Sequence, residues 1–443
     1  MSEDPQSYPS PDPDGPESGA TAGGPEGASS VNTRGVVPRS IIAAGAAWLR
    51  PGPHSDVVIS SRVRLARNLG DHDFPHRSTS RQREQLLAVC QLTLRGLPPL
   101  SEPGASATDL ASVQPAASAP TPPKAAPGSS KAARASKTSM PAQGDKPPEP
   151  SAEALPAQQY VWVNMHKLGQ LDKTLLVERH LISKEHAKGT EPRGLYFTLP
   201  DERLAIMVNE EDHLRIQVIR PGLALGQAIS QIDQVDDDIE HQLNYAFLPR
   251  LGYLTACPTN VGVGARLSVM LHLPGLRLTG DIEKVRRAAK DMSLAVRGYY
   301  GENSESVADL YQLSNQTTLG KSEADLRREI EVEIVPQIVD YERKARRDLR
   351  DKKRRHLDDH VFRALGLLRS ARLLSPEDAL ANLSLVRLGI VTGLIDDIAE
   401  QQATQLMLLT QPAHLQRYLG VELDQQRRRE VRADLVRQQL GGN

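Results

Sequence analysis

The stretch GLYFTLPDERLAIMVNEEDHLRIQVI, residues 194–219, carries the clearest structural signal in the sequence. Three short apolar runs are separated by the polar segments PDER and NEEDH, and this spacing is typical of three consecutive strands. The last two runs flank the acidic turn closely, so they predict an antiparallel hairpin. Neighbouring antiparallel strands of this kind favour an α+β fold.

Three other segments predict strands. Residues 56–68 (DVVISSRVRLARN) alternate with a period of two, which places Arg62 and Arg64 on one face. The opposite face is then formed by Val57, Ile59, Ser61, Val63 and Leu65. Residues 160–165 (YVWVNM) and 267–276 (LSVMLHLPGL) are short apolar runs that also fit strands.

Helical periodicity marks the remaining ordered segments. Apolar residues recur with a helical period over residues 80–95, where Ser80 is the expected N-cap, and over 223–248 and 281–297. From residue 322 to residue 441 strand signals nearly vanish. We therefore predict an antiparallel sheet flanked by helices, followed by a smaller all-helical C-terminal domain.

Low-complexity composition sets the expected domain limits. Residues 1–40 contain 20 Gly, Pro or Ser, and residues 101–150 contain 30 Ala, Pro or Ser with no aromatic side chain, so neither can bury a core. We expect a disordered tail over 1–40, a main domain over 41–335 with a low-complexity insertion at about 98–157, and a helical domain over 336–443. The Ala/Pro/Ser segment is either a surface insertion within one domain or a linker between two.

Charge and cysteine usage exclude several classes of protein. Lys plus Arg number 54 and Asp plus Glu number 55, so we expect neither general nucleic-acid binding nor attraction to a membrane. The N-terminus has no apolar signal-peptide core, which predicts a cytoplasmic protein. Cys90 and Cys257 cannot build a disulfide scaffold or a four-ligand zinc site, and Cys90 is expected to be buried. The basic run at 341–356 is expected to be a solvated helix face rather than a docking site for an acidic protein or DNA.

Five arginines occur in unusual sequence surroundings and suggest a phosphate site: Arg62, Arg64, Arg215, Arg266 and Arg297. Each guanidinium presents a planar fork of donors to phosphate oxygens, so five on one surface would clamp a polyphosphate. On an exposed strand, by contrast, such arginines would be an ordinary solvated surface.

The usual nucleotide-binding motifs are missing. NQTTLGKS, residues 315–322, is close to a P-loop but has Asn315 where the first glycine belongs, and no GxGxxG follows a strand. A nucleotide would therefore have to be held by arginine side chains rather than by a glycine-rich loop.

Acidic residues cluster in NEEDH (209–213) and GENSE (301–305). Such a run in a turn is usually a solvated tip, but NEEDH lies between strands that are apolar enough to be buried. Alternation lets only one of Glu210 and Glu211 face a given side. A carboxylate beside arginines can align a guanidinium substrate and accept its proton as nitrogen attacks phosphorus.

The motifs SSRVRLARN, RHLIS, NEEDHLR, LTACPTNVGVGAR, RGYYGENSE and QLSNQTTLGKSE occur in this order. Together they resemble those of the ATP:guanido phosphotransferase family, most closely its bacterial protein-arginine kinases (McsB type). The resemblance covers residues 47–96 and about 160–435. It implies a guanidino-kinase catalytic domain, ATP as the donor, Mg²⁺ as its counter-ion with no side-chain metal ligand, and phosphorylation of a guanidino nitrogen.

The resemblance also implies roles for individual residues. Glu211 matches the catalytic carboxylate, with Glu210 beside it, Glu302 resembles a second substrate carboxylate, and Cys257 stands at the active-site cysteine. His180 resembles a nucleotide-contacting histidine, and its other reading is a surface helix-cap residue. The implied ATP-binding set is Ser60, Ser61, Arg62, Val63, Arg64, His180, Arg215, Arg266, Leu267, Ser268, Val269, Met270, Arg297, Gly298, Tyr299, Tyr300 and Gly301.

Two positions depart from the family pattern. Val263 stands where a threonine is usual, which removes a hydroxyl but leaves both glycines of the loop. In RREVRA (428–433), Arg429 replaces the aspartate of a motif that resembles an allosteric phosphoarginine site. The replacement weighs against a regulatory switch there, although Arg428 and Arg432 could still hold a phosphate.

Three functions remain open from the sequence: a kinase for arginine side chains in proteins, a kinase for a free guanidine, and a phosphoarginine-binding adaptor without activity. Small-molecule members of the family carry a folded domain before the SSRVR-like strand and lack the C-terminal helical domain, which favours the first. We expect a cytoplasmic enzyme that marks proteins for quality control or stress regulation. Its expected partners are proteins with accessible arginines, an activator subunit, a Clp-type unfoldase or protease, and a second copy in a homodimer.

Overall fold

The computed structural model describes residues 37, 40–43, 46–100, 158–298 and 307–442. Nearly all of the expected tail, most of the expected insertion and the GENSE motif therefore lie outside the described residues.

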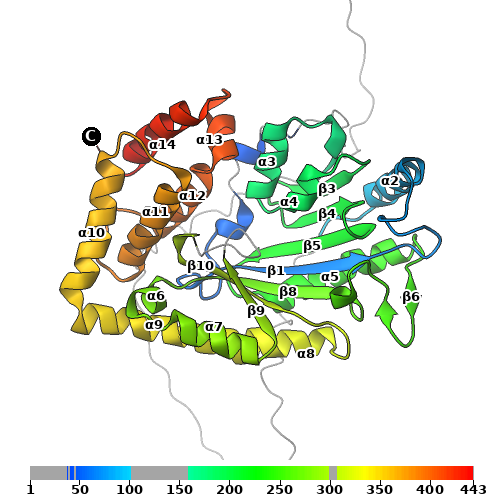
Figure 1. The fold of residues 1–443 in the computed structure, drawn as a ribbon, viewed down its shortest axis with the longest axis horizontal. Coiled ribbons are helices and arrows are strands. Elements are labelled where there is room, and N and C mark those ends of the chain that lie inside the picture. Colours follow the sequence, from blue (N-terminus) through cyan, green and yellow to red (C-terminus); the bar gives the residue numbers. More distant parts are fainter. Residues whose placement is uncertain (1–36, 38–39, 44–45, 101–157, 299–306, 443) are drawn as a thin grey trace, which may run out of the picture. The chain divides into compact units, whose positions relative to one another are not determined.

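An antiparallel sheet of eight strands, in the order β2-β3-β4-β5-β1-β8-β10-β9, forms the centre of the fold (Figure 1). The strand β1 (Val58–Arg67) lies between β5 and β8 and pairs with both. The other strands of the sheet are β2 (Gln159–Asn164), β3 (Gly194–Leu199), β4 (Leu204–Val208), β5 (Leu214–Pro221), β8 (Ala265–His272), β9 (Leu294–Gly298) and β10 (Leu310–Asn315). A separate hairpin is formed by β6 (Phe247–Leu248) and β7 (Gly252–Tyr253). The hairpin expected around NEEDH is β4–β5.

One face of the sheet is apolar and buried. Val63, Leu65, Leu267 and Val269 belong to the main core, which the sheet shares with helices α2, α5, α8 and α9. Burying these side chains supplies most of the free energy that orders the sheet. The helices are α2 (Ser80–Arg95), α5 (Leu225–Glu240), α8 (Glu323–Arg327) and α9 (Val335–Lys352), and a π-helix at Arg328–Ile334 joins the last two. Cys90 is fully buried in this core, as the sequence predicted.

On the opposite face, described helices cover both ends of the sheet, and the turn Ala47–Leu49 contacts β1 and β5 between them. Over β2–β4, α3 (Gln170–Glu178) and α4 (Lys184–Lys188) pack on a second apolar core. Near Met270 and Leu310, the C-terminal helices pack on a third core. These helices are α10 (Arg354–Ser370), α11 (Pro376–Val391), α12 (Glu400–Leu409), α13 (Pro412–Leu419) and α14 (Gln425–Gln439). The remaining elements are the short helices α1 (Ser40–Ala43), α6 (Pro274–Thr279) and α7 (Ile282–Asp291), and the 3₁₀ turns Ala47–Leu49, Met165–Lys167, Pro258–Asn260 and Val307–Asp309.

Several sequence-based boundaries were wrong. The helix expected over 281–297 ends at Asp291, because Ser293 turns the chain with a φ of 58° and the next residues pair with β10 as β9. The helix expected over 223–248 ends at Glu240. The N-cap of α2 is Thr79 rather than Ser80, since Thr79 and Gln82 form a reciprocal capping box.

The expected domain boundary near residue 335 falls inside a helical run. Ile338, Val339 and Ala345 of α9 pack in the main core with the sheet. Leu349 of α9 and Leu357 of α10 belong instead to the core of the C-terminal helices. The change of core therefore lies close to Lys353, where the backbone leaves helical geometry. Within the part of the chain that the structure describes, no helix combines the length and apolar character needed to cross a membrane.

Candidate active site

Strand register brings the five arginines onto one face of the sheet. Arg64 on β1 lies directly opposite Arg266 on β8, and Arg215 on β5 lies opposite Ala66, which shares the face of Arg64. Arg62 is two residues before Arg64, and Arg297 on β9 lies opposite Gln312 of β10. Because side chains alternate along strands, the polar positions of four strands converge here.

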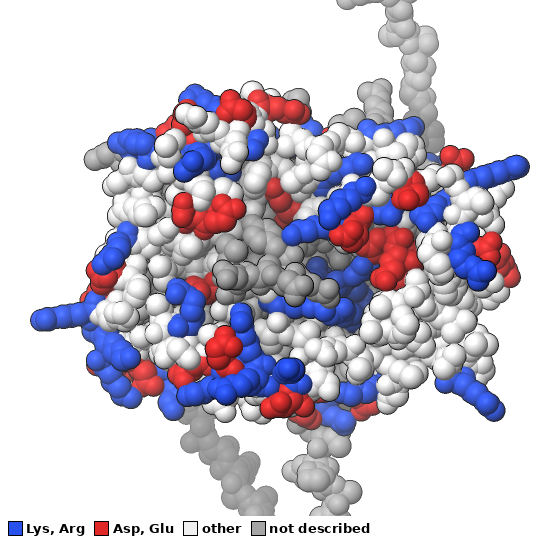
Figure 2. Space-filling view, in the orientation of Figure 1, with Lys and Arg blue, Asp and Glu red and all other residues white. Residues whose placement is uncertain are grey.

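A cavity of about 1160 Å³ opens on this face among the described residues. It is lined by four of the arginines together with Glu210, Glu211 and Cys257: the arginines are Arg64, Arg215, Arg266 and Arg297. Figure 2 shows a hollow over the central strands in which blue side chains lie beside red ones. The fifth arginine, Arg62, lies two residues before Arg64 on β1 and lines a separate, smaller pocket.

The arginines on this face are buried close to one another, so burial and mutual repulsion both disfavour their charged forms. Burial and the neighbouring charges of Arg62, Arg215 and Arg266 lower the pKa of Arg64 well below its usual value. Burial, with Arg215 and Arg266, likewise lowers the pKa of Arg62 to about 10. The buried Nε of Arg64 has no hydrogen-bond partner among the described residues. Unpaired buried cations are costly, so such an arrangement suits an anionic ligand that supplies the missing charge and acceptors.

Glu210 is committed to structure. Arg215 Nη1 donates to Glu210 Oε2 at 2.7 Å, and the hydroxyl of Ser183 donates to the other carboxylate oxygen. Although burial raises the pKa of Glu210, the charge of Arg215 and these hydrogen bonds lower it to about 2. In turn Glu210 outweighs the burial of Arg215 and raises the pKa of that guanidinium. The two groups hold each other charged and fixed.

Asp212 and His213 are also committed, because both bond to Asn68 after β1. Asn68 Nδ2 donates to Asp212 Oδ1 at 2.6 Å, and the backbone N–H of His213 donates to Asn68 Oδ1 at 2.9 Å. Asp212 Oδ1 further accepts the N–H of Ala256 at 2.7 Å, which fixes the residue before Cys257. The NEEDH turn, the end of β1 and the cysteine loop are thus one hydrogen-bonded unit.

Asn209, the first residue of the motif, also serves the turn. Its side-chain Nδ2 donates to the carbonyl oxygens of Arg83 and Pro192, both at 3.0 Å, and its φ is 62°. A short polar side chain tolerates this left-handed conformation better than most. Four of the five NEEDH residues are therefore held by their own bonds.

Glu211 is the exception. Its side chain is exposed to the cavity, and it makes no hydrogen bond or ion pair with any described residue. Burial of part of the carboxylate and the charge of Asp212 raise its pKa, while Arg215 partly offsets this. An available carboxylate with a raised pKa is the expected state of a general base.

The cysteine and glycine loop forms the rim of the cavity. Cys257 Sγ lies 3.0 Å from Thr259 Oγ1, and both residues line the cavity. Gly262 and Gly264 have φ values of 116° and 65°, and a Cβ on Gly262 would lie 2.7 Å from the carbonyl oxygen of Thr318. These positions require glycine. Val263 between them packs against the main core, so the threonine it replaces would also have pointed away from the cavity.

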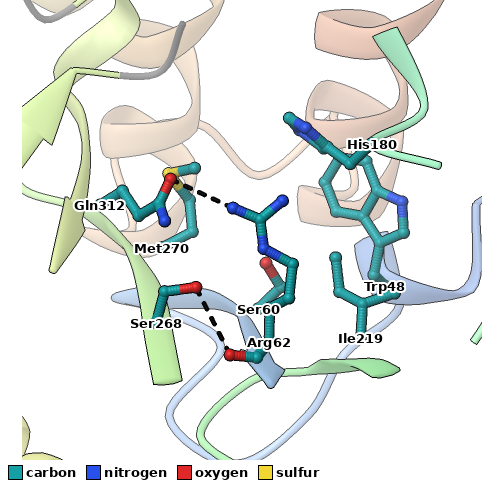
Figure 3. A pocket seen from close by; sticks show the side chains of 8 residues that line it. All are labelled: Trp48, Ser60, Arg62, His180, Ile219, Ser268, Met270 and Gln312. Carbon is teal, nitrogen blue, oxygen red and sulfur yellow. Dashed lines mark hydrogen bonds between the residues drawn. The ribbon is translucent and has the colours of Figure 1, made fainter. Parts of the chain in front are cut away.

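A second pocket surrounds Arg62 (Figure 3). Arg62 Nη2 donates to Gln312 Oε1 at 3.3 Å, and its guanidinium points toward His180 and Trp48. The ring centroids of Trp48 and His180 are 4.9 Å apart. His180 therefore lies just after the end of α3, and its buried ring lines this pocket rather than the protein surface. Burial, with Arg62 and Arg64, lowers its pKa to about 3 and keeps the imidazole neutral.

Several side chains expected at the site point elsewhere. Val63, Leu267 and Val269 are buried in the main core on the opposite face. Ser61 also faces away, since its hydroxyl donates to Gly222 O at 2.8 Å and accepts the N–H of Ala224 at 3.0 Å. The expectation that these four side chains contact a nucleotide is corrected, because adjacent strand residues face opposite sides. Ser60, Ser268 and Met270 do line the Arg62 pocket.

Some expected residues cannot be placed, and others were missed. Gly298 ends β9 beside Arg297, whereas Tyr299, Tyr300, Gly301 and Glu302 lie outside the described residues. The sequence assigned no role to several residues that line the two pockets, among them Trp48, Ser183, Glu185, Arg193 and Gln312. Ser183 is the last residue of the RHLIS motif and Gln312 is the first residue of QLSNQTTLGKSE, so assigning roles to every residue of those motifs would have found two of them.

Two other motifs have structural partners. Lys321 of the P-loop-like segment pairs with Glu329 at 2.6 Å, and Ser322 is the N-cap of α8. On α14, Arg432 is buried and donates to the carbonyl oxygens of Thr410 at 2.6 Å and Leu374 at 2.9 Å. Arg428 donates to the carbonyl oxygen of Leu423 at 2.6 Å. Lys321, Arg428 and Arg432 therefore all bond to other groups within the protein.

The chain matches two families along its length. Residues 152–345 match the ATP:guanido phosphotransferase, C-terminal catalytic domain. Residues 354–442 match the protein-arginine kinase McsB C-terminal domain.

Proteins of known name are similar over nearly the whole chain. The protein-arginine kinase of Geobacillus stearothermophilus is 38% identical over 398 residues, 90% of this chain and 94% of that protein. The protein-arginine kinase of Symbiobacterium thermophilum is 37% identical over 397 residues, 89% and 96% of the two chains. The crystal structure of a lombricine kinase aligns with a TM-score of 0.47 and 20% identity, covering 72% of this chain and 73% of that chain. The extent and identity of the first two matches establish that this chain belongs to the protein-arginine kinase family.

Proposed function

We propose that this protein transfers the γ-phosphoryl group of ATP to arginine side chains of other proteins. One observation carries the proposal: within a single cavity, Glu211 is the member of NEEDH left without a bond among the described residues, and four of the five arginines predicted to bind phosphate line the same cavity. The free carboxylate can bind a guanidinium, and the neighbouring arginines can bind a polyphosphate.

The arginines fit the phosphate groups of ATP. Arg64 and Arg266 face each other across β1 and β8, and Arg215 is held in place by Glu210. Their guanidinium forks would bind non-bridging phosphate oxygens and stabilise charge as the phosphoryl group moves. The crowding that lowers the pKa of Arg64 is relieved when a polyanion binds.

Mg²⁺ enters the proposal as the counter-ion of ATP. Among the described residues, no group of three or more His, Cys, Asp or Glu side chains could hold a metal ion. The donor set of the cavity is instead cationic and suits the phosphate oxygens that would carry the ion. When bound, Mg²⁺ would neutralise part of the phosphate charge.

Glu211 would align and activate the acceptor. Its carboxylate would accept hydrogen bonds from the guanidinium of the substrate arginine and turn one nitrogen toward the γ-phosphorus. As the N–P bond forms and the bond from phosphorus to the β,γ-bridging oxygen breaks, the nitrogen proton passes to Glu211 and ADP leaves. The raised pKa of Glu211 favours this proton transfer. Cys257 lies on the rim of the same cavity. By family resemblance, Glu302 would be a second carboxylate for the guanidine.

Protein substrates rather than free arginine are supported by the relatives and by the C-terminal helices. The two relatives described above are named for protein arginine, and they match across the helical region as well as the sheet. We assign protein recognition to the helical region that follows the change of core near Lys353. By family resemblance, the modification would mark proteins for quality control in the cytoplasm, with an activator and a Clp-type protease as partners.

The direct test is incubation with Mg·ATP and an unfolded basic protein, followed by detection of acid-labile phosphate on arginine. Labelled arginine that disappears in Glu211→Gln supports the proposal. Phosphate on serine or threonine, or labelling that persists in Glu211→Gln, would overturn it. Binding of phosphoarginine without any turnover would favour the adaptor function instead.

A further inference from the structure

Three consecutive residues at the end of α3 connect the C-terminal helices to the pocket of Figure 3. Glu178 and Arg179 bond to α13, and His180, the next residue, lines the pocket beside Arg62. Helices α3 and α13 contact each other, as their neighbouring labels in Figure 1 suggest.

Glu178 holds the first turn of α13. Its carboxylate accepts the backbone N–H groups of Ala413 and His414, both at 2.9 Å, and the Nδ1–H of His414 at 2.8 Å. Amides at a helix N-terminus lack partners inside the helix and carry partial positive charge, so a carboxylate is favoured there. One side chain of α3 therefore satisfies three donors of α13.

Arg179 strengthens the same connection. It is 2% exposed and donates from Nε and Nη2 to the carboxylate of Glu202 in the turn between β3 and β4. Its Nη1 lies 3.1 Å from His414 Nε2. Since His414 Nδ1–H donates to Glu178, Nε2 is the acceptor of the neutral ring and accepts a hydrogen bond from Arg179 Nη1. His414 thus binds both residues that precede His180.

His180 occupies an unfavourable backbone conformation. Its N–H donates to Val177 O at 3.0 Å, and the N–H of Leu181 donates to Leu176 O at 3.0 Å. This bond pattern ends a helix with a left-handed residue that is usually glycine, and His180 has a φ of 60°. A histidine persists there only where its surroundings fix it. Gln217 Nε2, which donates to His180 O at 2.5 Å, and the ring of Trp48 contribute from the sheet side.

We propose that α13 is a positioning element for the nucleotide: by holding Glu178 and Arg179, it keeps His180 in its left-handed conformation against Trp48 and beside Arg62. The inference rests on the proposed function, because it requires that the Arg62 pocket receives part of ATP. Loosening α13 then weakens ATP binding, while phosphoryl transfer at Glu211 proceeds at its usual rate.

The primary test is Glu178→Gln, which replaces one accepting oxygen by an amide that opposes the N–H groups of α13. We expect the KM for ATP to rise about three- to tenfold, with kcat changed less than about twofold. Trp48 and Trp162 are the two tryptophans of the sequence. In a Trp162→Phe background, the emission of Trp48 should therefore shift with Glu178→Gln, because its contact with His180 changes.

Two substitutions of His414 separate its two bonds and serve as well if Glu178→Gln fails to fold. Asparagine can replace the Nδ1–H that donates to Glu178, and glutamine can replace the Nε2 that accepts from Arg179. Each should raise the KM for ATP less than Glu178→Gln does. Wild-type KM and wild-type Trp48 emission in Glu178→Gln, or in both His414 variants, would overturn the inference.

Asp172→Asn is the matched control. Asp172 also joins α3 to α13, through Arg417, but it lies near the start of α3, away from His180. The Asp172→Asn variant should have a lower thermal stability and an unchanged KM for ATP. A rise in KM as large as that of Glu178→Gln would show that any loosening of α13 has this effect, and would overturn the positioning role. His180→Ala tests the nucleotide role of this pocket separately from arginine phosphorylation. If it leaves the KM for ATP unchanged, the nucleotide role of this pocket is wrong, whereas arginine phosphorylation is judged by the labelling assay alone.

Discussion

Arg215 donates to Glu210 at 2.7 Å, and this ion pair determines which of two adjacent carboxylates remains available for chemistry. Glu210 is bound on both oxygens, whereas Glu211 projects into the cavity without a hydrogen bond to any described residue. Adjacent residues of the same type therefore have different tasks. One fixes a cationic side chain, and the other is free to meet a substrate.

Glu211→Gln should lower kcat by about 10²-fold or more while the affinity for Mg·ATP stays within about twofold, because the amide cannot accept the guanidinium proton. The wild-type rate should also fall as the pH decreases through the raised pKa of Glu211, and the variant should lose that limb of the profile. Steady-state kinetics across pH measure both effects. Near-normal turnover in the variant would exclude Glu211 as the base.

Glu210→Gln should change stability rather than the acid limb of the rate. The pKa of Glu210 is lowered from 4.5 to about 2, so its ion pair stabilises the fold fully above pH 4.5 and loses this effect as the pH falls toward 2. Urea unfolding should show a large loss of stability for the variant at about pH 7 and a smaller loss at about pH 4. A loss of equal size at both pH values would contradict this linkage.

The sequence predicted the α+β order, the β4–β5 hairpin and the antiparallel sheet, because alternation and turn composition are local signals. It also identified the five arginines that the sheet brings together. The wrong boundaries, such as the helix expected through Arg297, arose where pairing with a distant strand decides the local structure. Ser61 and Val63 were assigned to the site with their neighbours, although alternation alone turns them toward the core. Trp48 carries no motif, so only the fold could place it beside His180.

Arg64→Ala should weaken Mg·ATP binding or its transition state by about 10²-fold in kcat/KM, because a lysine or water cannot replace a planar fork with two donors. Arg64→Lys should recover only part of the loss, and Arg266→Ala should behave like Arg64→Ala. Arg363→Ala is the control, since this exposed arginine on α10 pairs only with Asp359 among the described residues. Kinetics of Arg64→Ala that match those of Arg363→Ala would remove Arg64 from the phosphate site.

Residues 101–157 should be dispensable for catalysis. The two ends of this segment meet, because the N–H of Leu100 donates to Gln158 Oε1 at 2.8 Å. A short Gly/Ser linker can therefore replace the segment, and loop length itself has a small effect of about 0.6 kcal/mol per doubling. The shortened protein should remain soluble, with unchanged kcat and KM. Loss of folding or of activity would show that the segment has a structural role.

The central claim, that the acceptor is arginine within a polypeptide, is tested most directly by comparing two substrates in one assay. At equal arginine concentration, kcat/KM for an unfolded casein-like protein should exceed that for free L-arginine by at least ~10²-fold, which corresponds to ~2.7 kcal/mol of transition-state binding. Millimolar free arginine should then leave protein labelling almost unchanged. Equal turnover of the two substrates, or abolition of protein labelling by free arginine, would contradict the account and make the protein a free-guanidine kinase.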